Sequence, residues 1–421
     1  MGNFVIGGGS KVILQQETGT KYVVPFTSES VNPSAEFINS NAIVSNRAKG
    51  IGQKGNVAGD GNFDFEFSHK YLPYYFLGVL GAKDASKPVI YPSPDYLFDY
   101  NVFVEHGSAA SLRMEARRVK FNSLRVSFAS DGVMSGTVDF AGLKYVNASG
   151  TLSGTTAFAD SANFIFPQKL AAINKIITES DPIETTDWDA GIDMIPYLNS
   201  IEFTIANNLS TDLNKLDASG RMAVTGGEFA VTGTIEIVLD DEDTLGIGAA
   251  DIGTNWKAIA IKVADSSGST YHYIVLRNIY FTSLTHDISD RGAITISADF
   301  QCVYNASDTA KVLDGTTVTG AQPIVVAYDE SSTITLLTVR NTVDDEVPTG
   351  DIDGSNKTFT LAYTPIKEGS VVITVNSTTI KDLGYGVLSD GGTINYETGV
   401  FVLNEAPAGG STVTVDYIYF T

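Results

Sequence analysis

VKFNSLRVSFASDGVMSGTVDF, residues Val119–Phe140, returns later in the same chain as IYFTSLTHDISDRGAITISADF, residues Ile279–Phe300. Composition alone would give about one or two identities in a window of this length, and these stretches share more. In both, apolar and polar residues alternate, as in a β-strand with one buried face. Asp131-Gly132 and Arg291-Gly292 lie where a hairpin turn would fall. We therefore predict one β unit used twice. The identical pairs are Phe121/Phe281, Ser123/Ser283, Leu124/Leu284, Gly132/Gly292, Asp139/Asp299 and Phe140/Phe300.

The composition favours an all-β protein. The chain has 421 residues, enough for about three domains with sizeable cores. It contains 40 Gly, 19 Tyr and 22 Phe and only 18% charged residues, a composition typical of strands and turns. The expected fold is two tandem β-sandwich units that can form a barrel, each with a short helix, followed by a C-terminal β-sandwich.

The charge limits the classes of partner. The net charge is −22, from 27 basic and 49 acidic residues, so the chain lacks the basic stripe with which proteins grip nucleic acid. Nucleic acid that passes without being held remains compatible. No apolar run is long enough for a membrane-spanning helix, and the N-terminus lacks the pattern of a signal peptide. We expect a protein that is made and used without Sec export.

Two further segments extend the repeat. In Val57–Phe67, Phe residues alternate with Asp and Glu, and Val231–Leu239 alternates in the same way. The match of Val57-Ala58-Gly59 with Val231-Thr232-Gly233 extends the duplication beyond the opening stretch. Between the strands of the first copy, Tyr71–Leu80 is the best helix candidate, because Pro73 fits only near a helix start and Gly81 can end the helix.

Shorter segments along the chain give local predictions. Residues 1–20 are Gly-rich and polar and are predicted to form a flexible arm. Residues 83–96 contain three prolines and are predicted to be a loop. Lys169–Ile177 has apolar residues at helical spacing and is predicted to be a short amphipathic helix. Residues 332–339 are strand-like. Cys302 falls on the apolar side of its strand, so we expect a buried thiol.

The domain boundaries follow from charge and turn patterns. Residues 178–193 carry acids and no Lys or Arg, as expected of a solvated connector. Towards the C-terminus, strand-like runs come at about ten-residue spacing, which is typical of a small β-sandwich. We predict a first unit at residues 1–177, a second unit at 178–335 and a C-terminal sandwich at 340–421.

No motif indicates catalysis or a cofactor. The GxGxxG match at Gly50–Gly55 precedes a strand, whereas a dinucleotide site needs a helix there. Asp351–Asn356 lacks the distal Glu of a calcium loop, so a turn is favoured. The acidic run Asp240–Asp243 is a predicted hairpin tip at which weak calcium binding stays open. The four histidines show no metal-ligand spacing. We predict no catalytic, cofactor-binding or metal-binding residues, and no enzyme.

The order of these elements resembles the tail tube protein of long-tailed bacteriophages. An alternating strand with a V-x-G motif runs into a helix ending in Leu80-Gly81, and a loop, an N/T-S-L strand and a hairpin follow. The resemblance covers roughly residues 20–312 in two copies. Asp353–Leu361 and Ile394–Gly399 resemble immunoglobulin-like modules appended to phage virion proteins, which usually decorate the outside of a particle.

The resemblance implies a structural virion protein of the phage tail, made in the host cytoplasm. Its subunits would form stacked rings, and neighbouring inner strands would join into a barrel around a channel for double-stranded DNA. Closure of a sheet removes its exposed edges. Two units per chain and six units per ring predict a homotrimer, and six chains with twelve units are the alternative. The other predicted partners are further tail proteins.

Acids on the polar face of the repeated strands are candidates for lining the channel. Carboxylates repel phosphate, so DNA would stay hydrated and slide. The alternative is that this face is solvated on the outside of the ring. Lysines at several of these positions should slow DNA passage while leaving assembly intact. The candidates are Asp64, Glu66, Asp139, Glu236 and Asp299.

Two other functions stay open. One is a virion or cell-surface adhesin whose C-terminal sandwich binds host surface ligands. The other is a polysaccharide-acting tail enzyme, because carboxylate pairs arise readily among 49 acids. A tube protein predicts hollow cylinders, an adhesin predicts ligand affinity, and an enzyme predicts sugar release.

Overall fold

The fold comes from a computed structural model, and the chain forms two compact units. One unit holds residues 1–14, 23–153 and 157–334, and the other holds residues 15–22, 154–156 and 335–421. The structure describes residues 9–38, 53–84, 88–93, 96–107, 112–158, 164–176, 192–214, 221–238, 255–265, 267–287, 294–304, 311–312, 316–317, 322–336 and 340–421.

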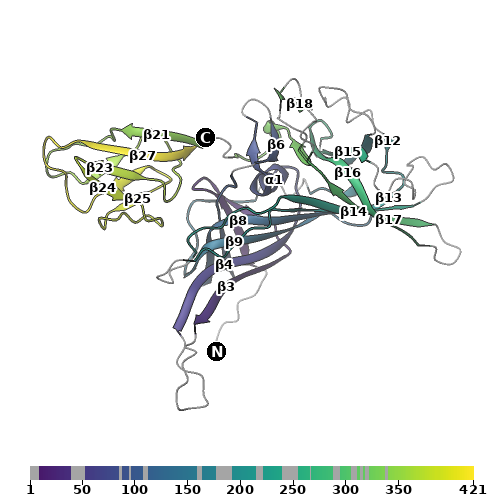
Figure 1. Ribbon diagram of the computed structural model, residues 1–421, viewed down its shortest axis with the longest axis horizontal. Helices are drawn as coiled ribbons and strands as arrows, with labels where there is room; N and C mark the ends of the chain where they lie inside the picture. Colours follow the sequence, from purple (N-terminus) through teal and green to yellow (C-terminus); the bar gives the residue numbers. More distant parts are fainter. Residues whose placement is uncertain are drawn as a thin grey trace, which may run out of the picture. The chain divides into compact units, whose positions relative to one another are not determined.

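Strands dominate both units, so the all-β prediction is confirmed (Figure 1). The described strands form open sheets and no closed barrel. In the described residues the α-helix is α1 (Leu72–Leu80), and 3-10 turns lie at Pro167–Lys169 and Glu330–Ser332. The strands before residue 336 are β1 Lys11–Gln16, β2 Lys21–Val24, β3 Ser28–Ile38, β4 Gln53–Glu66, β5 Gly81–Lys83, β6 Val89–Pro92, β7 Tyr100–His106, β8 Leu112–Ala129, β9 Ser135–Ala148, β10 Thr155–Thr156, β11 Leu170–Ile176, β12 Ile192–Asp193, β13 Leu198–Ala206, β14 Ala230–Val238, β15 Asn255–Ala264, β16 Tyr271–Asp287, β17 Thr295–Cys302, β18 Lys311–Val312, β19 Thr316–Thr317 and β20 Ile324–Ala327.

One order of antiparallel strands occurs twice in the first unit. The first strand set runs β3-β4-β9-β8-β7 across the sheet. The second strand set runs β13-β14-β17-β16-β15. Figure 1 shows β3, β4, β9 and β8 side by side, with the second strand set continuing the sheet. Each position in one set therefore has a counterpart in the other.

The hairpin predicted from the opening stretch is confirmed in the first set, where a turn at residues 130–132 joins β8 to β9. Phe121 lies opposite Phe140, and a register shift then brings Ser123 opposite Asp139. The same shift occurs between β16 and β17, whereas Arg291-Gly292 lies outside the described residues. There, Phe281 lies opposite Phe300 and Ser283 lies opposite Asp299.

The register corrects one detail of the predicted match. Gly61 lies opposite Phe140, and Gly233 lies opposite Phe300. Gly233 is therefore the counterpart of Gly61, and the predicted match of Gly59 with Gly233 is wrong by two residues. A Cβ on Gly61 would lie 2.3 Å from the Ser30 carbonyl oxygen, and one on Gly233 would lie 2.4 Å from the Phe300 ring. Both positions exclude a side chain.

The two strand sets are joined by one pairing. The first half of β8 pairs with β7, and its second half pairs with β13, from Ser123 opposite Ala206 to Ala129 opposite Ser200. In the second set, β15 pairs with the first half of β16 in the same way. We call the β8–β13 pairing the joint.

Helix α1 covers the apolar face of the first strand set and is buried along its whole length. The predicted helix at residues 71–80 is confirmed: Pro73 lies in the first turn, and Gly81 ends the helix in the left-handed conformation at φ 84°. Tyr75 stacks on Phe65 with ring centroids 4.0 Å apart. The repeated phenylalanines Phe121, Phe140, Phe281 and Phe300 are all buried. The counterpart segment between β14 and β15 lies outside the described residues.

The predicted helix at Lys169–Ile177 is wrong. Residues 167–169 form a single 3-10 turn, and Leu170–Ile176 is strand β11, paired with β15 from Val263 to Ala258. The short apolar spacing of this segment suits either structure, and the adjacent edge of β15 provides the hydrogen bonds that decide it.

Three other local predictions are wrong. Within the predicted arm, Lys11–Gln16 is β1, whose residues 12–16 are buried. Within the predicted loop at residues 83–96, Val89–Pro92 is β6, which pairs with β5 and β20. Pro92 ends that strand, where the missing N–H is tolerated. Of the predicted strand at 332–339, residues 332–336 form no strand, and residues 337–339 lie outside the described residues.

The second unit contains two antiparallel sheets around one apolar core. Phe359 and Phe401 stack at 5.4 Å inside it. The short segment 15–22 belongs to the same unit, where Lys21 forms an ion pair with Glu397. The strands are β21 Arg340–Glu346, β27 Val413–Phe420, β23 Val372–Val375 and β24 Thr378–Lys381 in one sheet, and β22 Thr358–Thr360, β26 Val400–Val402 and β25 Thr393–Asn395 in the other.

Candidate functional site

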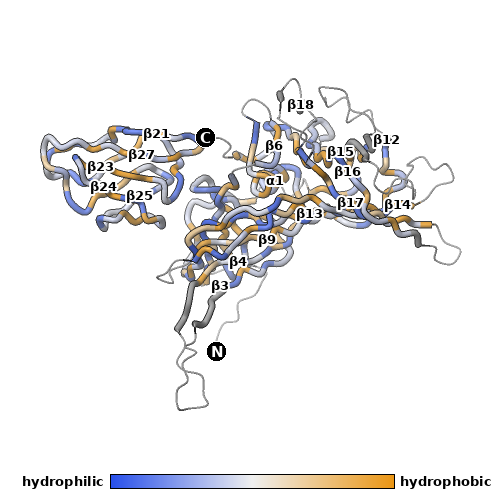
Figure 2. Tube along the Cα trace, in the orientation of Figure 1, coloured by the Kyte–Doolittle hydropathy of each residue, from blue (hydrophilic) through white to orange (hydrophobic). Residues whose placement is uncertain are grey.

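The candidate site is the polar side of the joined sheet, from β3 through β4, β9, β8, β13, β14 and β17 to β16. The opposite side is mostly buried along β4, β9, β8, β13, β14 and β17. Figure 2 shows the alternation of hydrophilic and hydrophobic residues along β4 and β9. We call this surface the polar sheet face. It is defined by the outward positions of β4 (62, 64, 66), β9 (135, 137, 139), β8 (123, 125, 127), β13 (200, 202, 204), β14 (232, 234, 236), β17 (297, 299, 301) and β16 (283, 285).

All of the sequence-predicted acids lie on this face. Asp299 is exposed, and the others are partly exposed. The joint brings the acids of the two strand sets onto one continuous surface, although they are far apart in the sequence. Each has a hydroxyl or amide side chain opposite it on a neighbouring strand, so no two of these acids are direct cross-strand neighbours. The pairs are Asp64 with Ser28 and Thr137, Glu66 with Ser135, Asp139 with Asn62 and Ser123, Glu236 with Ser200 and Ser297, and Asp299 with Thr234 and Ser283.

The aspartates opposite the repeated serines have matching hydrogen bonds. Ser123 Oγ donates to Asp139 Oδ2 at 2.6 Å, and Ser283 Oγ donates to Asp299 Oδ2 at 2.5 Å. Thr234 donates to the other oxygen of Asp299 at 2.8 Å. The hydrogen bonds from Ser283 and then Thr234 hold the pKa of Asp299 below its usual value.

The acids on β4 and β14 are held in the same manner. Asp64 accepts hydrogen bonds from Ser28 and, at 2.7 Å, from Thr137, and these two donors lower its pKa. Its counterpart, Glu236, accepts from Ser200 at 3.3 Å and from Asn199 at 2.9 Å. Because the hydroxyls stabilise the charged forms of Asp64 and Asp299, this face carries fixed, spaced negative charge at neutral pH.

Arg125 and Glu202 were missed by sequence reasoning. They lie on opposite sides of the joint, with Arg125 Nη2 2.7 Å from Glu202 Oε2. Hydrogen bonding and attraction to Glu202 raise the pKa of Arg125. Arg125 is the cation among the defined positions of the polar sheet face, and Glu202 balances it. Thr285 is the counterpart of Arg125, so the opening repeat contained no signal for this pair.

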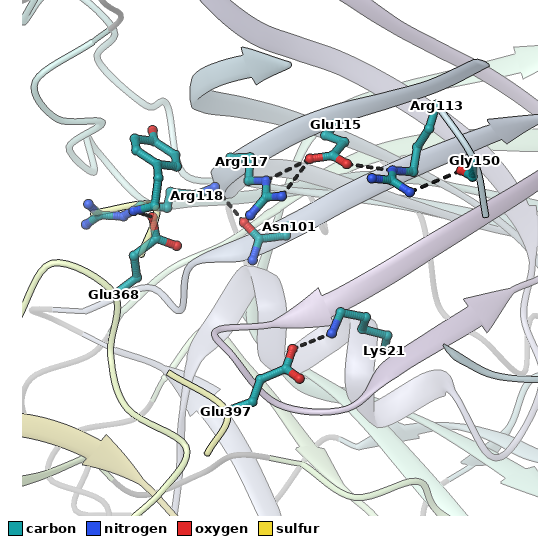
Figure 3. Close-up of polar contacts among 10 residues, drawn as sticks. Lys21, Asn101, Arg113, Glu115, Arg117, Arg118, Gly150, Glu368 and Glu397 are labelled. Atoms are coloured by element: carbon teal, nitrogen blue, oxygen red, sulfur yellow. Dashed lines mark hydrogen bonds and ion pairs between the residues drawn. The ribbon is translucent and has the colours of Figure 1, made fainter. Parts of the chain in front are cut away.

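The interior contains a different group of charges, on the first half of β8 (Figure 3). Buried Glu115 lies between Arg113 and Arg117, with N–O distances of 2.5 and 2.6 Å. Arg113 also donates to the Gly150 carbonyl at 3.1 Å. Figure 3 shows the Lys21–Glu397 ion pair of the second unit as well. The two arginines therefore compensate the charge of the buried Glu115 carboxylate.

Two histidines come together that the sequence left scattered. His69, just before α1, stacks on His272 of β16 with ring centroids 3.6 Å apart. His272 Nε2 lies 2.9 Å from the His69 carbonyl oxygen, and its Nδ1 accepts from the Asp329 N–H at 3.1 Å. Burial first, and then His69, lower the pKa of His272 to about 3. The lowered pKa keeps His272 neutral at neutral pH, and the pair is a packing contact within the first unit.

The remaining motif predictions have mixed outcomes. Asp353 accepts hydrogen bonds from the backbone N–H groups of Ser355 and Asn356, which confirms the predicted turn. Cys302 is buried, as predicted, and burial raises the pKa of its thiol far above the usual value. Residues 53–55 of the GxGxxG match begin β4. Residues 50–52 and Asp240–Asp243 lie outside the described residues.

The described residues contain neither a cluster of metal-ligating side chains nor a membrane-spanning helix. Within the described ranges, no three His, Cys, Asp or Glu side chains are grouped so that they could hold a metal ion. None of the helices described here has the length and apolar character needed to cross a membrane.

The family model of the phage tail tube protein matches residues 10–302. The match spans both strand sets and agrees with the resemblance predicted for residues 20–312. No curated protein matches the chain. The chain therefore belongs to the phage tail tube protein family and is a structural component of the virion tail. The second unit lies almost entirely outside the match.

Proposed function

We propose that three chains close into a ring, that the rings stack into a tube, and that double-stranded DNA passes through its lumen during genome delivery. Each strand set is one tube unit of a duplicated domain. Family membership supports the tube. The joint supports the ring, because it is a pairing between two such units within one chain.

The joint leaves two matching edges at the ends of the joined sheet. In the described residues, β3 pairs with β4, and its other edge has no strand beside it. The last part of β16, beyond its pairing with β15 at Tyr280, pairs with β17 alone. β3 is the counterpart of β13, and the end of β16 is the counterpart of the part of β8 that binds β13. A second copy of the chain can therefore repeat the joint between molecules.

The subunit count follows from the units per chain. If a ring contains six units, three chains with two units each complete it, and the symmetry is threefold with a pseudo-sixfold arrangement. Each closed ring then contains three joints within chains and three between chains. A ring of six chains would contain twelve units.

The polar sheet face is proposed to line the lumen. Its carboxylates are spaced between hydroxyl and amide side chains, and Arg125 is balanced by Glu202. Such a surface repels phosphate and offers no array of cations to hold it, so DNA passes without specific binding.

A disulfide across the proposed joint tests the ring. In the joint, Thr204 lies opposite Arg125. Their counterparts are Asn32 and Thr285, which are both exposed. The variant Asn32→Cys/Thr285→Cys should form disulfides between chains under mild oxidation, and non-reducing gels should show covalent products up to the trimer. The matched control is Ser28→Cys/Ser283→Cys, in which the two cysteines are about six residues out of register.

The outcomes are distinct. Equal products from both variants would contradict the register, and an absence of linked chains would contradict the joint between molecules. A series of products reaching six chains would contradict the homotrimer. Negative-stain microscopy of the same samples should show hollow rings or cylinders.

The second unit is proposed to be an immunoglobulin-like module on the outside of the tube. Its position outside the family match supports a role separate from the channel. The adhesin alternative would require this unit to bind host surface ligands. Deletion of residues 340–421 should leave ring formation intact and should reduce host attachment only if the adhesin reading holds.

A further inference from the structure

The two counterpart strands β3 and β13 differ at their inward-facing positions. In β13, these positions hold Ile201, Phe203 and Ile205, which are all fully buried. The register of Gly61 and Gly233 makes Glu29, Val31 and Pro33 their counterparts in β3. β13 has strands on both sides, whereas one edge of β3 is open in the described structure.

The backbone of these positions points to the open edge. Next to the joint, the Asn207 N–H donates to Asn122 O, and Asn199 O accepts from the Ser130 N–H. Odd-numbered residues of β13 therefore direct their backbone groups towards β8. By the same register, Glu29, Val31 and Pro33 direct theirs to the open edge of β3.

Neither Val31 nor Pro33, at the centre of this edge, offers an available N–H group. The Val31 N–H donates to Glu29 Oε2 at 3.0 Å, so its own strand already satisfies it. Pro33 has no N–H to donate. An inward-facing charge and an edge proline are two known means by which proteins prevent sheets from pairing edge to edge.

The Glu29 carboxylate is held in place. Its other oxygen lies 3.9 Å from His106 Nε2, and the Glu29 side chain is only 16% exposed. Release of the Val31 N–H by Glu29 would therefore also disturb its contact with His106 on β7.

We propose that Glu29 and Pro33 form a capped edge that hinders pairing of β3 with a second copy of this chain. This inference rests on the ring proposed above. For a ring to close, Glu29 must release the Val31 N–H. The freed N–H can then donate to a β16 carbonyl of the neighbouring chain. The joint within the chain carries no such cap, because Ile201 and Ile205 occupy the counterpart positions. Free chains therefore assemble only at higher concentration than their uncapped counterparts.

Variants that make β3 resemble β13 test the cap. Glu29→Ile should lower the protein concentration at which rings appear by about tenfold, which corresponds to one charge-assisted hydrogen bond. Glu29→Gln, which keeps the shape and loses the charge, should lower it less. Glu66→Ile is the matched control, because it removes an acid of the polar sheet face away from this edge, and it should leave the threshold unchanged. Sedimentation gives the threshold, and negative-stain microscopy identifies rings.

The results separate the two proposals. The ring proposal stands if Asn32→Cys/Thr285→Cys forms linked rings. In that case the cap is wrong if Glu29→Ile and Glu29→Gln form rings at the same protein concentration as wild type, or if they give only an amorphous pellet. If neither rings nor specific disulfides form in any variant, the ring itself is wrong and the cap falls with it.

Discussion

The two strand sets fill the same framework with different side chains. The first set packs Phe63 and Phe65 beneath α1, whereas the second has Ile235 and Ile237 at the counterpart positions. The bulge after the paired phenylalanines, the serine opposite an aspartate and the glycine opposite a phenylalanine are kept in both. Features that shape the backbone are therefore repeated, while the filling of the core and the chemistry of the edges differ.

The largest expected effect tests the repeated glycine. Gly61→Ala and Gly233→Ala should each lower the free energy of unfolding by about 3 kcal/mol, because the new Cβ would lie within 2.5 Å of a backbone oxygen. Urea unfolding of the purified chain measures this. Gly226→Ala is the control, since a Cβ there would meet nothing within 4 Å. If Gly61→Ala cost no more than Gly226→Ala, close packing would not explain the repeated glycine.

The next effect tests the contact of His69 with His272. The pKa of His272 is about 3 in the folded chain and about 6.5 when unfolded. Between these values the unfolded state binds more protons than the folded state. The contribution of neutral, buried His272 to the free energy of unfolding is therefore fully present above pH 6.5. It falls on acidification by up to about 1.4 kcal/mol per pH unit. In His272→Gln, the loss of stability between pH 6.5 and 4.5 should be smaller than in wild type, with His106→Gln as the control. An unchanged slope in His272→Gln would show that His272 is not the group responsible.

Sequence reasoning found the framework through its repeated positions. The echo at Phe121 and Phe281 led to the hairpins, and the alternation in β4 placed Asp64 and Glu66 on the polar side. The match of Gly59 with Gly233 failed because Gly59 and Gly61 both end a short G-containing pattern in β4. Only the cross-strand register, with Gly61 opposite Phe140, separates the two.

The missed features depend on partners distant in the sequence. β1 pairs with β2 and β7, and β6 pairs with β5 and β20. The local composition of β1 and β6 does not indicate these pairings. The Arg125–Glu202 pair exists because the joint brings β8 beside β13. His69 and His272 likewise meet only through tertiary packing, because they lie about 200 residues apart in the chain and stack in the fold. Periodicity predicts which side of a strand is polar, and tertiary pairing decides which polar residues meet.

The smallest expected effect concerns the repeated serine. Ser123→Ala and Ser283→Ala each remove a hydrogen bond to an aspartate, and each should cost less than about 1 kcal/mol because Asp139 is partly exposed and Asp299 is exposed. In Ser283→Ala, the pKa of Asp299 should rise towards its usual value, although Thr234 still donates to it. The lowered pKa stabilises the fold above the unfolded value and this contribution is lost as pH falls, so Ser283→Ala should be less sensitive to acid in this range. NMR titration of the Asp299 carboxyl measures the change, and Thr285→Ala on the same strand, opposite Ser297, is the control. If the pKa of Asp299 stayed as low in Ser283→Ala as in wild type, Thr234 alone would hold the carboxylate charged, and the repeated serine would need another explanation, such as the geometry of the bulge.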